Sequence, residues 1–193
     1  MQVFHLDINK ELDTADFRYH LNAVLPNDIC VRYIRQVQDE VHARFDAISR
    51  SYRYFILKEK DPFRIGEAYI YHQELNIEKL NAASKVLIGK QNFESFSKVK
   101  TQVNNFICNV TKANWKENGN NTVFEIEANR FLRGMVRSVV GTLLLVNEGK
   151  LEPEQMIDII SGRDRKLAGR SVPAEGLFLW NVDYPQKIFI NKD

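Results

Sequence analysis

"NNFICNVTKANWKENGNNTVFEIEAN", residues 104–129, predicts a β-hairpin and with it an antiparallel sheet. Two segments of alternating character, rich in β-branched and aromatic residues, flank the polar cluster "ENGNN". The Asn-Gly pair inside that cluster is a strong hairpin signal, because both residue types accept the positive φ of a tight turn. We therefore expect two long strands joined by a short connection.

A third strand is expected at "SRSYRYFI", residues 49–56. Side chains alternate between the two faces of a strand, so Tyr52 and Tyr54 share one face with Arg50, while Arg53 lies on the other. Two interpretations remain open. This is either a half-buried strand whose arginines reach into solvent, or a platform for a planar, negatively charged substrate.

Helices are expected on both sides of these strands. Apolar spacing and end signals predict them over residues 13–26, 75–89, 130–148 and 152–162, with Asp13 or Thr14 as the N-cap of the first and Gly89 as the C-cap of the second. Further strands are expected over residues 1–8, 28–37 and 175–185.

The order of these elements predicts an α+β protein with a mainly antiparallel central sheet and helices packed on it. Residues 1–40 offer too few elements to close a sheet of their own. We expect them to be the remainder of an incomplete N-terminal α+β domain, followed by a C-terminal α+β domain over residues 41–193.

The helix expected over residues 130–148 combines core and charge. Its apolar stripe is predicted to be buried, and Arg130, Arg133 and Arg137 follow at helical spacing beside it. Gly134 and Gly141 would let another backbone or a ligand approach closely. The arginine row is either a solvated face or a set of partners for a carboxylate or for phosphates.

Composition excludes several classes of protein. The 193 residues carry a net charge of only +2, so bulk charge does not indicate a nucleic-acid binder. The two cysteines predict no disulfide framework and favour a reducing cytosol. We expect no signal peptide, membrane span, metal site or cofactor, because no segment carries the matching motif. Residues 163–170 are expected to form a basic loop. The simpler interpretation of this loop is that it is mobile and solvated.

Several segments together resemble the TruA family of tRNA pseudouridine synthases. They are "LPNDICVRYIRQVQDEVHARF", "FDAISRSYRYFI", "NFESFSK", "FEIEANRFLRGMVRSVVGTLL" and "AEGLFLWNVDYP", and they follow the family's order and spacing over nearly the whole chain. The resemblance implies a pseudouridine synthase fold made of ferredoxin-like halves around a basic cleft. It also implies a cytoplasmic homodimer that acts without cofactor or metal.

The resemblance further implies an activity and its residues. The family isomerises uridine to pseudouridine at positions 38 to 40 of the tRNA anticodon stem-loop. An aspartate attacks the nucleoside, a tyrosine packs on the uracil, and an arginine pairs with the aspartate. The tyrosine falls on Tyr52 and the arginine on Arg137. The arginines expected to contact substrate are Arg44, Arg50, Arg53 and Arg133.

One family feature is missing. The nucleophilic aspartate of the family lies in a "G-R-T-D-x-G-V-H-A" motif, which the 193 residues do not contain. "MQVFHLD" resembles the strand that follows it, so we expect the chain to lack the family's N-terminal segment and to be inactive alone. The alternatives are a non-catalytic RNA-binding module of the same fold and a structural protein whose arginines are merely solvated.

Overall fold

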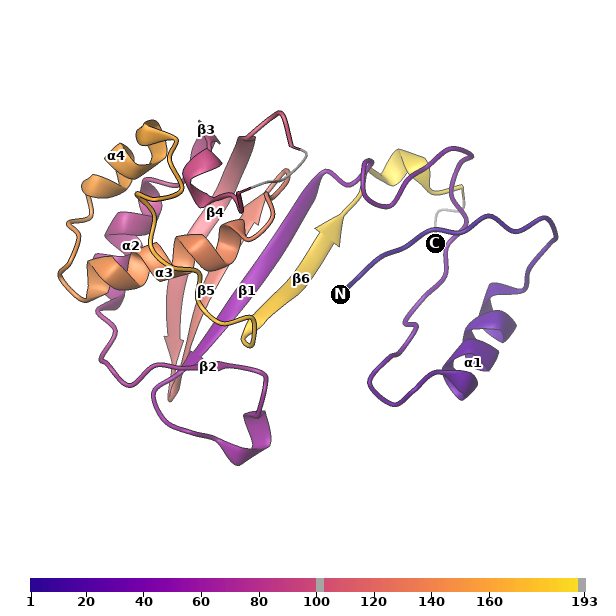
Figure 1. The fold of residues 1–193 in the computed structure, drawn as a ribbon. Coiled ribbons are helices and arrows are strands. Elements are labelled where there is room, and N and C mark those ends of the chain that lie inside the picture. Colours follow the sequence, from indigo (N-terminus) through magenta and orange to yellow (C-terminus); the bar gives the residue numbers. More distant parts are fainter. Residues whose placement is uncertain (100–102, 191–193) are drawn as a thin grey trace. The chain divides into compact units, whose positions relative to one another are not determined.

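The computed structural model describes residues 1–99 and 103–190 and divides the chain into two compact units (Figure 1). Residues 1–2 and 49–183 form the first unit, and residues 3–48 and 184–193 the second. The expected domains, 1–40 and 41–193, stay a prediction, and residues 100–102 and 191–193 of the second of them lie outside the described residues.

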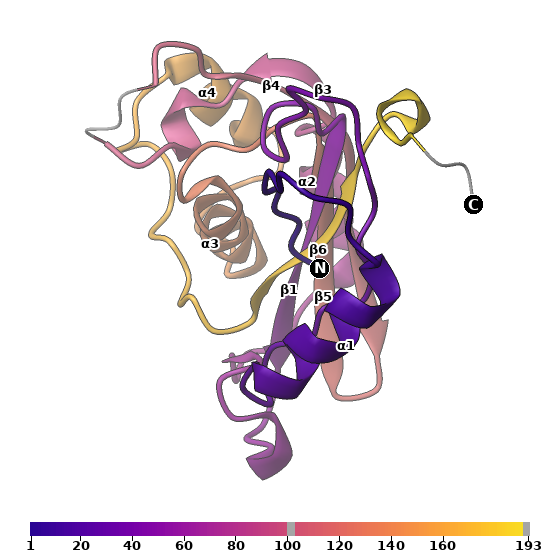
Figure 2. The same cartoon turned by 90° about the vertical axis from the view of Figure 1, so that its right-hand side faces the viewer.

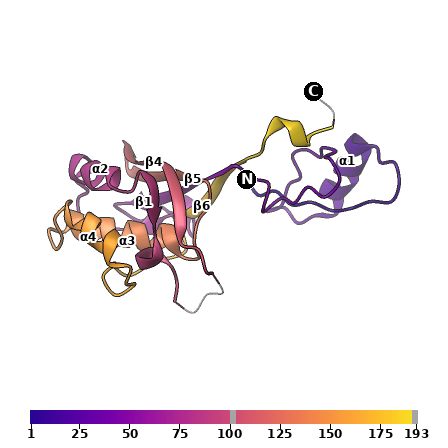
Figure 3. The ribbon, with the colours of Figure 1, turned by 90° about the horizontal axis from the view of Figure 1, so that it is seen from above.

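A six-stranded sheet is the frame of the first unit. Its strands are β1 (Ser49–Leu57), β2 (Tyr69–Ile70), β3 (Gly89–Asn92), β4 (Ile107–Asn118), β5 (Asn121–Ala128) and β6 (Leu177–Asp183). The order is β2-β1-β5-β4-β3, with β6 paired to β1. Figure 3 shows the strands from above, with helices beside them. All pairs are antiparallel except β1 with β2. The predicted hairpin and the mainly antiparallel α+β fold are confirmed.

Three helices cover one face of this sheet. They are α2 (Ile77–Lys85), α3 (Met135–Asn147) and α4 (Gln155–Gly162), and Figure 2 shows α3 and α4 on the same side of the strands. Tyr54 and Ile126 point into the core that these helices bury. We call this the inner face. The alternation of a strand places Arg53 and Glu125 on the opposite side, which we call the open face.

The helix expected from residue 130 begins only at Met135. Gly134 precedes it in the left-handed conformation, with φ 77°, and that backbone interrupts the helix. The prediction that Arg130, Arg133 and Arg137 share one helical row was therefore wrong. The predicted apolar stripe is buried as expected, at Leu132, Met135, Val136, Val139, Val140, Leu143 and Leu144.

Two smaller predictions about this unit were also wrong. Gly89 does not cap α2, which ends at Lys85; it begins β3 instead, with φ 105°. Residues 163–170 form a basic loop as predicted, with Arg163, Lys166 and Arg170 exposed, but the expectation that the whole loop is solvated fails at Ala168, which is buried. The strands β2 and β3 were not expected, since runs of two and four residues carry too little periodicity.

The second unit contains helix α1 (Thr14–Val24), capped by the Asp13 carboxylate as expected. The strands predicted over residues 1–8 and 28–37 are absent, apart from one bridge between Val37 and Phe189. An alternating sequence forms a strand only where a neighbour completes its hydrogen bonds. Among the described residues of this unit only Ala47 and Ile188 are buried, so it has almost no core.

Candidate active site

Tyr52 lies near the middle of β1, paired with Ile126 of β5 and Leu179 of β6. Its ring meets Phe131 edge-on, with 5.0 Å between the ring centroids, and it is half-buried on the inner face. Burial raises the pKa of the Tyr52 phenol, and the nearby Arg50 charge only partly opposes this. The phenol is therefore neutral near pH 7 and can donate or accept a proton.

Arg137 lies in the first turn of α3, where the backbone amides create a positive potential. Its Nε donates to the carbonyl of Val172 at 2.6 Å, and the Val172 amide donates back to the Arg137 carbonyl at 3.1 Å. No other described residue accepts from its two terminal NH2 groups. A guanidinium in this position is suited to an anion with two oxygens, such as a carboxylate or a phosphate.

Tyr54 follows two residues after Tyr52 on the same face and is completely buried. Its hydroxyl donates to the carbonyl of Pro173 at 2.9 Å, next to the carbonyl that Arg137 uses. Burial and the neighbouring Tyr69 raise the Tyr54 pKa, while the Arg137 charge lowers it. Tyr52, Tyr54 and Arg137 thus belong to one inner-face neighbourhood.

Two other predicted site residues border this neighbourhood. Arg50 follows the start of β1, where its Nη1 donates to the Asn129 carbonyl at 2.7 Å and its charge lowers the Tyr52 pKa. Arg133 is exposed just before α3, and its carbonyl accepts from the Lys98 amide at 2.8 Å. Arg50 therefore adds positive charge beside the neutral phenol, and Arg133 adds positive charge just before α3.

Arg53 lies on the opposite side of the sheet from Tyr52. Its guanidinium contacts the Glu125 carboxylate at 2.6 Å and lies 3.8 Å from the centre of the Trp180 ring. Lys112 and Lys116 bind the same carboxylate at 2.7 and 3.3 Å. The structure therefore brings Arg53 together with an ion-pair network and not with Tyr52 and Arg137.

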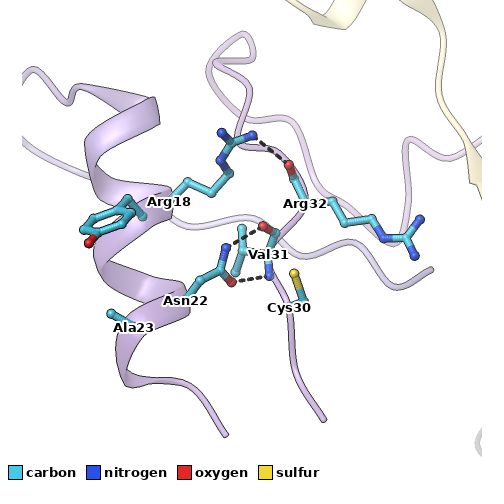
Figure 4. A pocket seen from close by; sticks show the side chains of 7 residues that line it. Arg18, Asn22, Ala23, Cys30, Val31 and Arg32 are labelled. Atoms are coloured by element: carbon cyan, nitrogen blue, oxygen red, sulfur yellow. Dashed lines mark hydrogen bonds between the residues drawn. The ribbon is translucent and has the colours of Figure 1, made fainter. Parts of the chain in front are cut away.

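Arg44 is exposed in the second unit, with its guanidinium 5.6 Å from the Phe45 ring centre. The same unit has a groove between α1 and residues 30–32 (Figure 4). There Asn22 pairs with the backbone of Val31, and Arg18 donates to the Arg32 carbonyl. None of the predicted site residues lines this groove.

The described part of the chain contains neither a candidate metal site nor a candidate membrane-spanning helix. No three His, Cys, Asp or Glu side chains of residues 1–99 and 103–190 gather closely enough to hold a metal ion. In the same residues, every helix is too short or too polar to span a bilayer.

Sequence reasoning missed the segment that orients Arg137. Residues 168–173, which we call the strap, run along α3 between α4 and β6, and Val172 and Pro173 supply the carbonyls described above. One signal pointed to it: Gly141 inside a helix predicts a close backbone approach. A Cβ at Gly141 would lie 1.8 Å from the Arg170 carbonyl oxygen.

The chain is similar in sequence to known proteins. A family model described as tRNA pseudouridine synthase matches residues 83–185. The chain is 44% identical to tRNA pseudouridine synthase A of Bacteroides thetaiotaomicron, over 98% of this chain and 71% of that protein. It is 38% identical to the Bacillus subtilis protein of the same name, over 95% of this chain and 75% of the relative.

Proposed function

The chain belongs to the tRNA pseudouridine synthase family, and on that premise we propose that its inner-face neighbourhood is the uridine site for the tRNA anticodon stem-loop. The substrate uridines are those at positions 38 to 40. Such a uridine is paired or stacked, so it reaches the enzyme by extrusion from the helix. Neither a cofactor nor a metal takes part in this proposal.

Tyr52 and Arg137 have separate roles. Tyr52 packs its ring on the extruded uracil, and its neutral phenol is close to where a proton must move at C5. Arg137 pairs with the carboxylate of the nucleophilic aspartate through its terminal NH2 groups, and in this chain, which contains no G-R-T-D motif, the same groups bind an RNA phosphate. The observation that carries this proposal is the Arg137 guanidinium, fixed at Nε by Val172 and left with two donors without acceptors among the described residues.

The remaining arginines contact the RNA backbone. Arg50, beside Tyr52, and Arg133, exposed just before α3, are proposed to bind phosphates next to the extruded nucleotide. Arg44 is exposed on the second unit and is proposed to contact a phosphate elsewhere on the stem-loop. Arg53 is the weakest of the four, because the Glu125 carboxylate already neutralises it.

Binding tests the RNA proposal directly. The affinity of the 193-residue chain for a tRNA anticodon stem-loop should fall with rising salt, and Arg137→Ala should weaken it by about 3- to 30-fold, the usual range for a lost charged hydrogen bond. Lys90→Ala is the matched control, because it removes one positive charge from the exposed face of β3. Equal losses for the two variants would contradict a specific role of Arg137.

Turnover is a separate prediction. The chain contains no G-R-T-D motif, so we expect no tritium release when it is mixed alone with tRNA labelled at C5 of uridine. Release at a rate proportional to the concentration of this chain would refute the expected inactivity.

A second candidate function, a non-catalytic RNA-binding module, is favoured by the same missing motif. The curated relatives are longer than the match, which covers 71% of the Bacteroides thetaiotaomicron protein. Co-expression of this chain with the unmatched part of that relative should restore tritium release if the chain is a synthase. Binding without any restored release would favour the module.

Two further proposals concern the oligomeric state and the cellular location of the chain. We propose that the chain forms a homodimer through the open face, where Phe178 and Trp180 are 37% and 46% exposed and lie beside both signs of charge. Aromatic and arginine side chains of this kind are enriched in protein interfaces. Unpaired Cys30 and Cys108 fit a reducing cytoplasm.

A further inference from the structure

The strap, residues 168–173, is fastened to α3 at two places besides Arg137. The Gly169 amide donates to the Thr142 hydroxyl at 2.9 Å, and that hydroxyl donates to the Ser138 carbonyl at 2.8 Å. The backbone of the strap also crosses α3 at Gly141, where a side chain would collide with the Arg170 carbonyl. Position and direction of the strap are thus set by small residues and one hydroxyl of α3.

The sheet holds the other end of the strap through Tyr54. Its ring is completely buried, and β1 is paired on both sides by β5 and β6, so the position of the hydroxyl is well defined. This hydroxyl donates to the Pro173 carbonyl at 2.9 Å. Because burial raises the Tyr54 pKa, the phenol remains a donor over the whole physiological pH range.

Arg137 takes its orientation from the carbonyl between these anchors. Val172 accepts from Arg137 Nε at 2.6 Å, one residue before the carbonyl that Tyr54 holds. A guanidinium is planar, so fixing Nε also fixes the plane and the direction of the terminal NH2 groups. Arginine otherwise keeps many rotamers, and a mobile fork pairs poorly with a carboxylate.

We infer that Tyr54 is a positioning residue for Arg137, acting through the strap by holding Pro173 and thereby the Val172 carbonyl. The importance of Arg137 in this inference rests on the proposed function. The hydrogen bonds that link Tyr54 to Arg137 through the strap do not. Tyr54 touches no substrate in this proposal. Its hydroxyl couples strand β1 to the orientation of a guanidinium on α3.

Tyr54→Phe tests the inference, because it removes the hydroxyl and keeps the ring. Tyr71→Phe is the matched control: Tyr71 is buried in the same core, and its hydroxyl bonds Glu148 and Gln73 instead of the strap. The readout is the Arg137 Nε–H signal in the NMR spectrum of the full 15N-labelled chain. Neither substitution changes the charge of the protein.

The expected result concerns exchange with water. Loss of the anchor should make the Arg137 Nε–H exchange about 2- to 10-fold faster in Tyr54→Phe, the effect of one lost hydrogen bond, and leave it unchanged in Tyr71→Phe. Unchanged exchange in a folded Tyr54→Phe protein overturns the inference, as does an equal effect of Tyr71→Phe. If Tyr54→Phe does not fold, Thr142→Val removes the strap's other hydroxyl anchor and must give the same acceleration.

A double-mutant cycle on stem-loop affinity separates this inference from the proposed function. Tyr54→Phe should weaken binding when Arg137 is present and add nothing in the Arg137→Ala background. An additive effect overturns the inference. No effect of Arg137→Ala on binding would instead contradict the proposed function, while the exchange measurement would still decide whether Tyr54 positions the guanidinium.

Discussion

Glu125 shows how a single residue on the open face holds a charge inside the protein. Its side chain is only 9% exposed and binds Arg53, Lys112 and Lys116. Burial by itself would raise the Glu125 pKa, but the hydrogen bonds from both lysines and the charge of Arg53 outweigh it, and the pKa is lowered. The network therefore stabilises the charged carboxylate.

This lowered pKa makes stability depend on pH. A carboxyl whose pKa is lower in the folded state stabilises the protein above its unfolded pKa, near 4.5, and this contribution is lost as pH falls through the folded value. Glu125→Gln should therefore cost about 1–3 kcal/mol at pH 7, and much less in strong acid. Urea unfolding at both pH values measures the difference.

The exposed Glu117 on β4 provides the control for this prediction. Glu117→Gln should change the free energy of unfolding by less than about 0.5 kcal/mol at either pH, as is usual for surface sites. A Glu125→Gln cost that stays the same from pH 7 into strong acid would contradict the proposed role of the carboxylate charge.

At the scale of elements, the contact between α3 and the strap decides where the site residues lie. Gly141 lets the backbone of the strap approach α3, and the approach brings the Val172 carbonyl to Arg137. The helix must also begin late, at Met135 after the left-handed Gly134, so that Arg137 lies in its first turn. The two glycines thus have different roles: Gly134 sets where α3 begins, and Gly141 lets the strap cross it.

Gly141→Ala should destabilise the first unit. The new Cβ would lie 1.8 Å from the Arg170 carbonyl oxygen, so the strap or the helix must shift, and overpacking of this kind costs about 1–3 kcal/mol or more. Ser138→Ala in the same helix is the control. Its buried hydroxyl lacks a hydrogen-bond partner among the described residues, so removing it should cost nothing or stabilise slightly.

Thermal or chemical unfolding of the two variants checks this prediction. The same pair should also separate in stem-loop binding, with Gly141→Ala weaker than Ser138→Ala, because a displaced strap no longer orients Arg137. Equal stability of the two variants would mean that the strap can move away from α3 at little cost.

At the scale of the whole molecule, the two units differ in how they are stabilised. The first has a core that runs from the inner face of the sheet through three helices. In the second, α1 buries none of its residues, and Tyr19, Val24 and Phe45 are among the exposed apolar side chains. A helix without a buried face gains little stability from packing, so further contacts are needed to hold it.

The proposed dimer is tested at this scale. Trp180→Ala removes the large exposed ring of the open face and should shift the chain from dimer to monomer in sedimentation equilibrium, because truncated aromatic anchors often cost 2 kcal/mol or more, roughly. Ile157→Ala removes an apolar side chain from α4 that is even more exposed than Trp180, and it should leave the dimer intact. A wild-type chain that is monomeric at micromolar concentration would contradict the proposal.

The sequence by itself determined the local elements and the family. The hairpin turn at Gly119, the Asp13 cap and the buried apolar stripe of α3 follow from short-range patterns, since turns, caps and helical spacing depend on neighbouring residues. The family resemblance also singled out Tyr52 and Arg137 within one chain. Their roles in the reaction stay a prediction.

Only the tertiary structure decided which of these residues meet. Strand alternation already placed Tyr52 and its neighbour Arg53 on opposite faces, but only the structure shows which face the helices cover and that Arg53 meets Glu125 on the uncovered one. It also left residues 1–8 without strand partners. Strand pairing and the crossing of the strap over α3 join segments far apart in the sequence, and local preferences do not encode such contacts.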